Sequence, residues 1–187
     1  TSATSSVTVP TNLGIGLYAG SVGTYNLSAG SLLVYSSLVP SQEIIGSQGT
    51  GYFYQSGGTH TASSTALASG AGATARYGGG TLTSGMSVAG AGTGVFTQTG
   101  GTANLSLNLT PYGSGASATA NLSGTGTLNT GYLQTGGSGS SVFNQSGGTH
   151  TTTYAYLGQA GSTSYNLTGG SHTVTSQFYL DFSSGAT

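Results

Sequence analysis

The sequence of 187 residues contains no cysteine, no lysine and no tryptophan, and it has very little charge. Without cysteine the chain has no disulfides, no thiolate nucleophile and no cysteine-based zinc site. Charged residues make up 2% of the chain, whereas about a quarter of an ordinary soluble domain is charged. The charged residues are Arg76, Glu43 and Asp181, and the histidines are His60, His150 and His172.

This scarcity of charge excludes several classes of partner. A single arginine cannot neutralise the phosphates of a nucleic acid or attract an anionic membrane surface. No apolar run approaches the about 20 residues of a membrane-spanning helix. The longest runs, such as 32–35, have the length of a strand. We therefore expect no nucleic-acid partner and no membrane span.

The chain begins at Thr1, without methionine and without a basic and apolar leader. Such a start is expected after removal of a signal peptide, or for a partial chain. A surface rich in Ser, Thr and Gly but free of lysine is more typical of extracellular than of cytoplasmic proteins. We predict an extracellular or cell-surface location.

What the sequence has instead is a repeat in which an aromatic residue is followed by Gly-Gly-Thr or a close variant. Clear copies are 53–60, 143–150 and 165–172, and copies begin at positions 25, 53, 75, 96, 120, 143 and 165. Most steps are about 22 residues, a period typical of stacked arrays. The first step is longer and holds an insertion around Val39–Glu43. We expect one domain over 1–187, with a strand-like segment over 1–12, repeats over 13–182 and a tail over 183–187.

Each unit contains three short segments with the composition of β-strands. The first runs from the aromatic residue to Gly-Gly, the second begins Thr-x-Thr, and the third is exemplified by Tyr154–Gly158 and Leu17–Gly20. Glycine supplies the positive φ that tight corners need. Units of three strands and three corners predict an all-β fold, a three-faced β-solenoid of seven to eight coils of about 22 residues each.

Alternation along the strands predicts which side chains point inward. The first-strand aromatics share a face with the Leu or Gln two residues later, and we assign this face to the interior. We expect the amides of Gln55, Gln98 and Gln145 to stack there as a ladder. The closing segment Val174–Phe182 also alternates. The outward positions are Asn26, Tyr54, Arg76, Thr97, Asn121, Asn144 and Asn166.

The strings FNQSGGTHT at 143–151 and YNLTGGSHTV at 165–174 resemble bacterial surface β-helix repeats. Such repeats occur in autotransporter-like passengers and in secreted proteins with PEP-CTERM sorting signals. The resemblance covers residues 13–182. It implies a β-helical stalk, an adhesin or a surface layer.

The three histidines share one repeat position, after Gly-Gly-Thr or Gly-Gly-Ser. Stacked imidazoles on adjacent coils could bind a metal. The simpler interpretation, which we prefer, is that histidine fills a structural position that other coils give to Leu32, Leu82, Ala103 and Leu128. We therefore predict no metal site and no cofactor.

The sequence supplies almost no groups for catalysis. Paired carboxylates must share one cleft, but Glu43 and Asp181 lie at opposite ends of the array. A Ser-His-Asp site would need Asp181 beside His172, and nothing in the sequence favours it. A phosphate-binding loop needs a lysine, and there is none. We predict no catalytic residues and no enzymatic activity.

These observations favour a non-catalytic extracellular structural protein that assembles into a filament, sheath or surface layer. The alternative is a carbohydrate- or surface-binding adhesin stalk, in which tyrosines such as Tyr54 and Tyr179 contact sugars. A less favoured alternative is an ice-binding face made of Thr-x-Thr rows. Leu33, Asn104 and Asn129 interrupt those rows.

Partners follow from the same features. A solenoid ends in two open sheet edges, and neither end shows a polar cap, so we expect a homo-oligomer or filament formed by end-to-end strand pairing. Glycans are also expected, because six asparagines begin an Asn-x-Ser/Thr sequon. These candidate glycosylation sites are Asn26, Asn104, Asn108, Asn121, Asn144 and Asn166.

Overall fold

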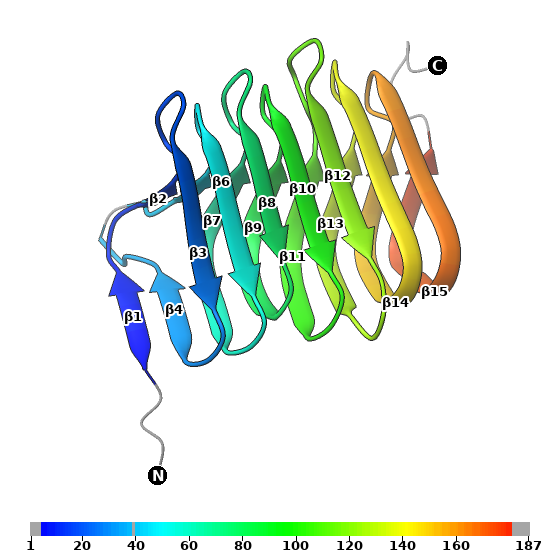
Figure 1. Ribbon diagram of the computed structural model, residues 1–187. Helices are drawn as coiled ribbons and strands as arrows, with labels where there is room; N and C mark the ends of the chain where they lie inside the picture. The colour runs from blue at the N-terminus through cyan, green and yellow to red at the C-terminus, as the bar shows by residue number, and fades with distance from the viewer. Residues whose placement is uncertain (1–4, 39, 181–187) are drawn as a thin grey trace.

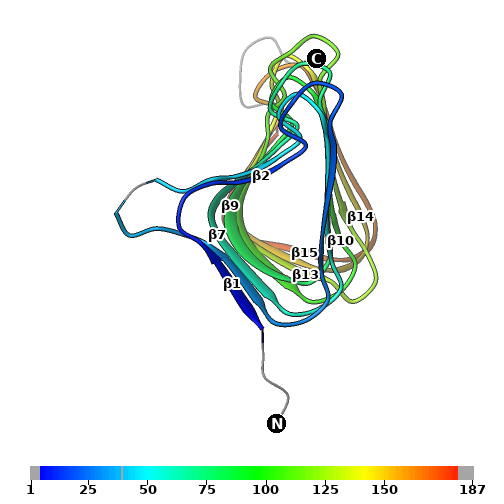
Figure 2. The same cartoon turned by 60° about the vertical axis from the view of Figure 1, so that its left-hand side comes forward.

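A computed structural model describes residues 5–38 and 40–180, and in these ranges the chain contains strands and no helix (Figure 1). Every strand pair is parallel, and the chain winds through about 8 turns of about 23 residues. The predicted all-β solenoid is therefore confirmed. Viewed nearly along the stack, the turns superimpose into one hollow outline whose interior is filled by side chains (Figure 2).

The strands form three faces, each built from one segment of every turn. The first face contains β3 (Val22–Leu27), β6 (Thr50–Gln55), β8 (Thr74–Gly78), β10 (Thr93–Gln98), β12 (Ser117–Leu122) and the beginnings of β14 (Ser140–Leu157) and β15 (Ser162–Leu180). The second face contains β1 (Ser6–Val9), β4 (Ser31–Val34), the beginnings of β7 (Thr59–Leu67), β9 (Thr81–Val88), β11 (Thr102–Leu109) and β13 (Thr127–Thr135), and the middle of β14 and β15. The third face contains β2 (Leu13–Ile15), β5 (Glu43–Ile45) and the ends of β7, β9, β11, β13, β14 and β15.

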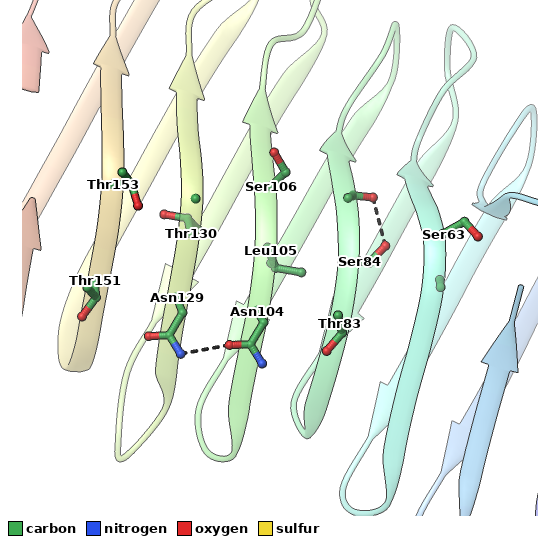
Figure 3. A pocket seen from close by; sticks show the side chains of 13 residues that line it. Ser63, Thr83, Ser84, Asn104, Leu105, Ser106, Asn129, Thr130, Thr151 and Thr153 are labelled. Carbon is green, nitrogen blue, oxygen red and sulfur yellow. Dashed lines mark hydrogen bonds between the residues drawn. The ribbon is translucent and has the colours of Figure 1, made fainter. Parts of the chain in front are cut away.

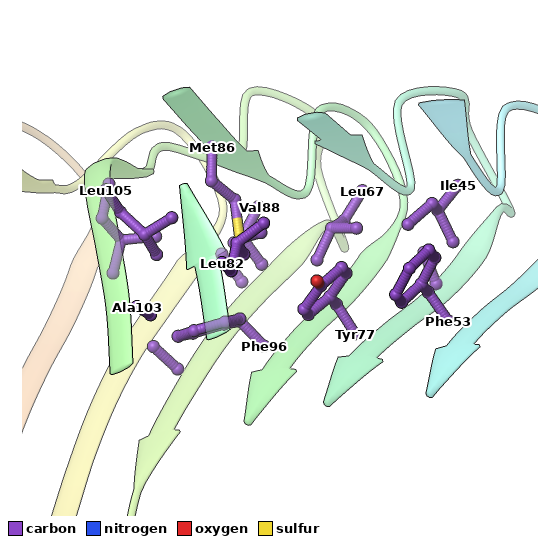
Figure 4. Close-up of a cluster of buried hydrophobic side chains, with 14 of the residues drawn as sticks. Ile45, Phe53, Leu67, Tyr77, Leu82, Met86, Val88, Phe96, Ala103 and Leu105 are labelled. Atoms are coloured by element: carbon purple, nitrogen blue, oxygen red, sulfur yellow. The ribbon is translucent and has the colours of Figure 1, made fainter. Parts of the chain in front are cut away.

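The core is a set of columns in which equivalent side chains of successive coils stack. On the first face Phe53, Phe96 and Phe143 are fully buried. The rings of Tyr25 and Phe53 are nearly parallel with centroids 5.2 Å apart, and those of Phe53 and Tyr77 are nearly parallel with centroids 4.7 Å apart. Leucine, isoleucine and valine from the third face pack against these rings (Figure 4). The predicted inward face is thus the core.

Glycine is required at corners where successive turns approach closely. Gly101 has a φ of +68°, and a Cβ there would lie 2.6 Å from the carbonyl oxygen of Gly80. Gly170 has a φ of +80°, and its Cβ would lie 2.4 Å from the carbonyl oxygen of Gly148. The repeated Gly-Gly therefore permits both the turn and the coil-to-coil contact.

Three details of the sequence prediction need correction. Tyr77, rather than Ala75, is the partner of Phe53, because the corner after β8 is two residues shorter than the corner after β6. Leu17–Gly20 forms a turn, and the third-face strand of that unit is β2. The stack also begins before residue 13, since β1 pairs with β4.

The closing segment follows its predicted alternation as far as the structure describes it. Val174, Phe178 and Leu180 occupy the inward columns of β15, whereas Asp181 and Phe182 lie outside the described residues. In the described parts of the chain, no helix has the length and hydrophobicity needed to cross a membrane.

Candidate functional site

The most unusual group in the interior is Glu43, the first residue of β5, which is completely buried. Its Oε2 accepts a hydrogen bond from Thr65 Oγ1 (2.9 Å) and lies 3.6 Å from His60 Nε2. Its Oε1 has no hydrogen-bond partner among the described residues. A carboxyl group with so few donors is costly to ionise in the core.

A chain of hydrogen bonds continues from His60 across the core. The Tyr77 hydroxyl donates to Gln55 Oε1 (3.0 Å), and His60 Nδ1 lies 2.8 Å from that hydroxyl oxygen. Because the tyrosine proton is committed to Gln55, His60 Nδ1 carries a proton and donates it to Tyr77. Nε2 of the neutral ring is then an acceptor that faces the carboxyl of Glu43.

Burial keeps both members of this pair neutral. Desolvation raises the pKa of Glu43 to about 8, partly opposed by the Thr65 hydrogen bond, and desolvation lowers the pKa of His60 to about 4. The short distance between the two groups suggests an ion pair, but desolvating both charges costs more than their attraction returns. At neutral pH one proton therefore stays on the carboxyl side, next to His60 Nε2.

The same arrangement recurs near the other end of the stack. The Tyr165 hydroxyl donates to Gln145 Oε1 (3.0 Å), and His150 Nδ1 lies 3.2 Å from that hydroxyl. Here Thr130 Oγ1, 3.0 Å from His150 Nε2, takes the place that Glu43 has in the first set. Burial, followed by repulsion from His172, lowers the pKa of His150 to about 3.

The histidines occupy the structural position that the sequence predicted. The three histidines lie in register in one column of the second face, and the other coils fill this column with Leu32, Leu82, Ala103 and Leu128. His150 and His172 stack with centroids 4.4 Å apart. Among the described residues no three His, Asp or Glu side chains gather as metal ligands would.

The buried glutamines do not form the predicted amide ladder. Gln98 Nε2 instead donates to the carbonyl oxygens of Gly80 (2.9 Å) and Gly100 (2.6 Å). Gln55 likewise binds the carbonyls of Gly58 and Thr81. The amides thus tie the corners of adjacent coils together.

The ladder of amides lies outside, on the first face. Asn144 Nδ2 donates to Asn121 Oδ1 (3.0 Å), and Asn166 Nδ2 donates to Asn144 Oδ1 (2.8 Å). These three sequon asparagines and the exposed Asn26 share the predicted outward face. Asn104 is on the second face and accepts a hydrogen bond from Asn129 (3.0 Å), whereas Asn108 is half-buried on the third face.

A shallow depression of about 580 Å³ follows the corner between the second and third faces, across β7, β9, β11, β13 and β14 (Figure 3). Hydroxyl and amide groups line it together with the apolar Ala62 and Leu105, and none of the lining side chains is charged. Gly131 lies in this lining, and a Cβ there would meet nothing within 4 Å. Tyr132 and Tyr154 directly follow the lining residues Gly131 and Thr153 in the chain.

Both ends of the stack leave core columns uncovered. At the C-terminal end the inward-facing Leu167 and Leu180 are 51% and 67% exposed, and Phe178 is 48% exposed. At the N-terminal end Val7, which stacks on Leu32, is 47% exposed. Among the described residues, no Asp, Glu, Lys or Arg side chain belongs to the edge strands β1, β2 and β15 at the two ends of the stack.

Comparison of the chain with protein-family models, with curated proteins and with solved structures finds no match in any of the three. The features of the chain that bear on its function are therefore the buried network, the depression and the open ends.

The sequence analysis placed Glu43 in an insertion and did not predict its burial. Glu43 and Ile45 alternate in the sequence as Thr65 and Leu67 do in the next coil, and this pattern could have indicated that Glu43 faces inward.

Proposed function

We propose that this chain is a non-catalytic extracellular structural protein that assembles end to end into a filament, sheath or surface layer. The observation that carries the proposal is the exposure of the inward columns at both ends of the stack. Such residues are buried in every interior coil, so another stack placed on either end would bury them as well.

The two ends are suited to one another. All strands are parallel, so the C-terminal edge of one copy presents β15 to the N-terminal edge of the next, which presents β1 and β2 on two of the faces. Unpaired strand edges add strands readily. A net charge of −1 supplies almost no repulsion between copies. A head-to-tail contact of this kind propagates into a filament unless rotation closes it.

The acid inventory supports a role without catalysis. Within the described residues Glu43 has the sole carboxyl side chain, and it is enclosed in the core beside His60. A general acid or base must reach its substrate within hydrogen-bond distance. Glu43 is out of reach of any ligand on the surface.

Sedimentation and electron microscopy of the purified chain test the assembly. We expect concentration-dependent filaments for the natural sequence and monomers for Leu180→Lys, which places a charge in an open column at the C-terminal end. Tyr54→Lys is the matched control, because Tyr54 is 47% exposed on the outer side of β6, a strand paired on both sides within the stack, and it should assemble normally. A natural chain that stays monomeric at high concentration would contradict the proposal.

A second candidate function, binding of a neutral glycan, is favoured by the uncharged depression with tyrosines beside it. Hydroxyl and amide groups can exchange hydrogen bonds with sugar hydroxyls. Gly131→Tyr would fill the depression, and it should abolish co-sedimentation with an insoluble neutral polysaccharide. Gly78→Tyr on the first face, where the nearest atom to an added Cβ is 3.9 Å away, is the control. Equal binding by both variants would exclude the depression as the site.

A further inference from the structure

Four tyrosines gather on the outer side of the third face in the last three coils. Tyr132 is paired in register with Tyr154 on the next strand, and Tyr156 is paired with Tyr179. Tyr156 is the centre of the group. Its ring centroid lies 5.0 Å from that of Tyr132 and 5.3 Å from that of Tyr179.

The cluster is solvent-accessible, with each ring half-buried or exposed. The Tyr156 hydroxyl donates to Gln177 Oε1 (3.1 Å). Partial desolvation, followed by the neighbouring Tyr132, Tyr179 and Tyr154, raises the pKa of Tyr156.

Tyrosine is also the residue type of this chain that is best suited to form a covalent cross-link. The sequence has no cysteine for disulfides and no lysine for amide or imine links, but it has 12 tyrosines. A cross-link would stabilise the last coil in particular, because β15 pairs only with β14 among the described residues. The terminal unit of a stacked array has one neighbour instead of two and is the first to fray.

We propose that Tyr132, Tyr154, Tyr156 and Tyr179 form an oxidative cross-linking site, centred on Tyr156, where a dityrosine bond joins neighbouring coils. The oxidant is hydrogen peroxide, used by a haem peroxidase. The bond forms within one chain, so the site goes beyond the proposed structural function and stands whether or not the chain assembles.

The chemistry balances without any group from the protein other than the two phenols. Each tyrosine loses one electron and one proton and becomes a phenoxyl radical. The two radicals couple at their ortho carbons, and the two ortho hydrogens then move to the phenol oxygens as the rings regain aromaticity. One carbon–carbon bond forms, the pair of residues loses two hydrogen atoms, and one hydrogen peroxide is reduced to two waters.

Geometry selects this cluster over the other exposed tyrosines. Rings about 5 Å apart on adjacent strands need rotation of their side chains, and exposed side chains rotate within nanoseconds. Tyr18 and Tyr112 are 75% and 66% exposed but have no ring neighbour within the described part of the chain. Tyr52 and Tyr54, with centroids 5.9 Å apart, belong to one strand, so a link between them would join no coils.

The test treats the dilute full chain with a haem peroxidase and one equivalent of hydrogen peroxide. We expect a monomer that is lighter by two hydrogen atoms, and linked peptides in which Tyr156 is joined to Tyr132 or Tyr179. Hydrogen exchange of the β15 amides should slow in the Tyr156–Tyr179 product. Tyr156→Phe should lower the yield of links between coils about tenfold, because the remaining pair of the site, Tyr132 and Tyr154, is farther apart, with ring centroids 6.5 Å from one another.

Two further variants keep the result interpretable. Tyr179→Phe should remove the link between β14 and β15 and retain the link to Tyr132. Tyr54→Phe, the matched control in the other tyrosine pair, should leave the yield of links between coils unchanged. An undiminished yield in Tyr156→Phe, links confined to different chains through Tyr18 or Tyr112, or no loss of hydrogen would each overturn the proposal.

Discussion

Replacing Glu43 by glutamine should stabilise the fold at neutral pH and have little effect in acid. The folded carboxyl has a pKa of about 8, raised from 4.5 by burial. Below pH 4.5 the group is protonated in both states, so its contribution to stability is at its maximum. As pH rises from 4.5 to 8 the unfolded chain releases the proton and the folded chain retains it, and stability falls.

The magnitude follows from the size of the shift. Each pH unit within this window costs about 1.4 kcal/mol, so the ionisable group destabilises the fold by about 3 kcal/mol at pH 7. Glu43→Gln keeps the shape and can accept the Thr65 hydrogen bond, but it cannot ionise. Its advantage over the natural chain should therefore grow from pH 5 to pH 8.

Urea unfolding at several pH values measures this advantage, and hydrogen exchange of β5 and β7 measures it locally, because stacked coils can open separately. Gln42→Glu is the matched control: its side chain is exposed, and the added carboxylate should not change the pH dependence. A stability difference for Glu43→Gln that is the same at pH 5 and pH 8 would refute the argument. It would mean that Glu43 is already ionised in the core.

Three further outcomes are expected. The pKa values of His60 and His150 are lowered to about 4 and about 3. The unfolded imidazoles therefore bind protons below pH 6.5 before the folded ones do, and stability should fall by about 1.4 kcal/mol per pH unit for each ring. An acid titration of the unfolding midpoint checks this. Gln98→Ala removes the buried amide that donates to two corner carbonyls and should cost about 1–3 kcal/mol in urea unfolding. Gly101→Ala forces a Cβ against Gly80 at positive φ and should lower the melting temperature, whereas Gly131→Ala, in open space, should not.

Much of the fold was predictable because the interior repeats. The alternation of inward aromatic, Leu or Gln residues with outward residues indicates which side of each first-face strand is buried, and the histidine position follows from its leucine equivalents. The register of the third copy was not predictable by eye. Tyr77-Gly78-Gly79-Gly80 lacks two corner residues, and matching the glycines shifted the aromatic residue out of its column.

Polar contacts were harder to predict than burial. The sequence showed that Gln98 points inward, but its partners are corner carbonyls whose positions depend on how adjacent coils stack. The tyrosine cluster was also missed, because Tyr132 lies in a bulge-shifted strand where simple repeat counting fails. Tyr179 was assigned to a sugar-binding surface, a prediction that stays untested, without reference to its neighbours.

Register also makes a prediction about the proposed filament. In a head-to-tail stack, β1 and β2 of one copy would follow β15 of its neighbour on the second and third faces. On the first face the next described strand is β3, which belongs to the following coil, so the described residues leave one strand position between β15 and β3 at each junction. Strands in a sheet are about 4.8 Å apart, so β15 and β3 cannot pair across that position.

A junction paired on two faces should be weaker than any contact between coils of one copy, each of which is paired on three. Dilution should therefore shorten filaments in electron micrographs before hydrogen exchange within the coils changes. Moderate urea should release folded monomers for the same reason. If instead the filaments persist until the coils themselves exchange, the first-face position is filled at every junction, and all three faces carry the contact.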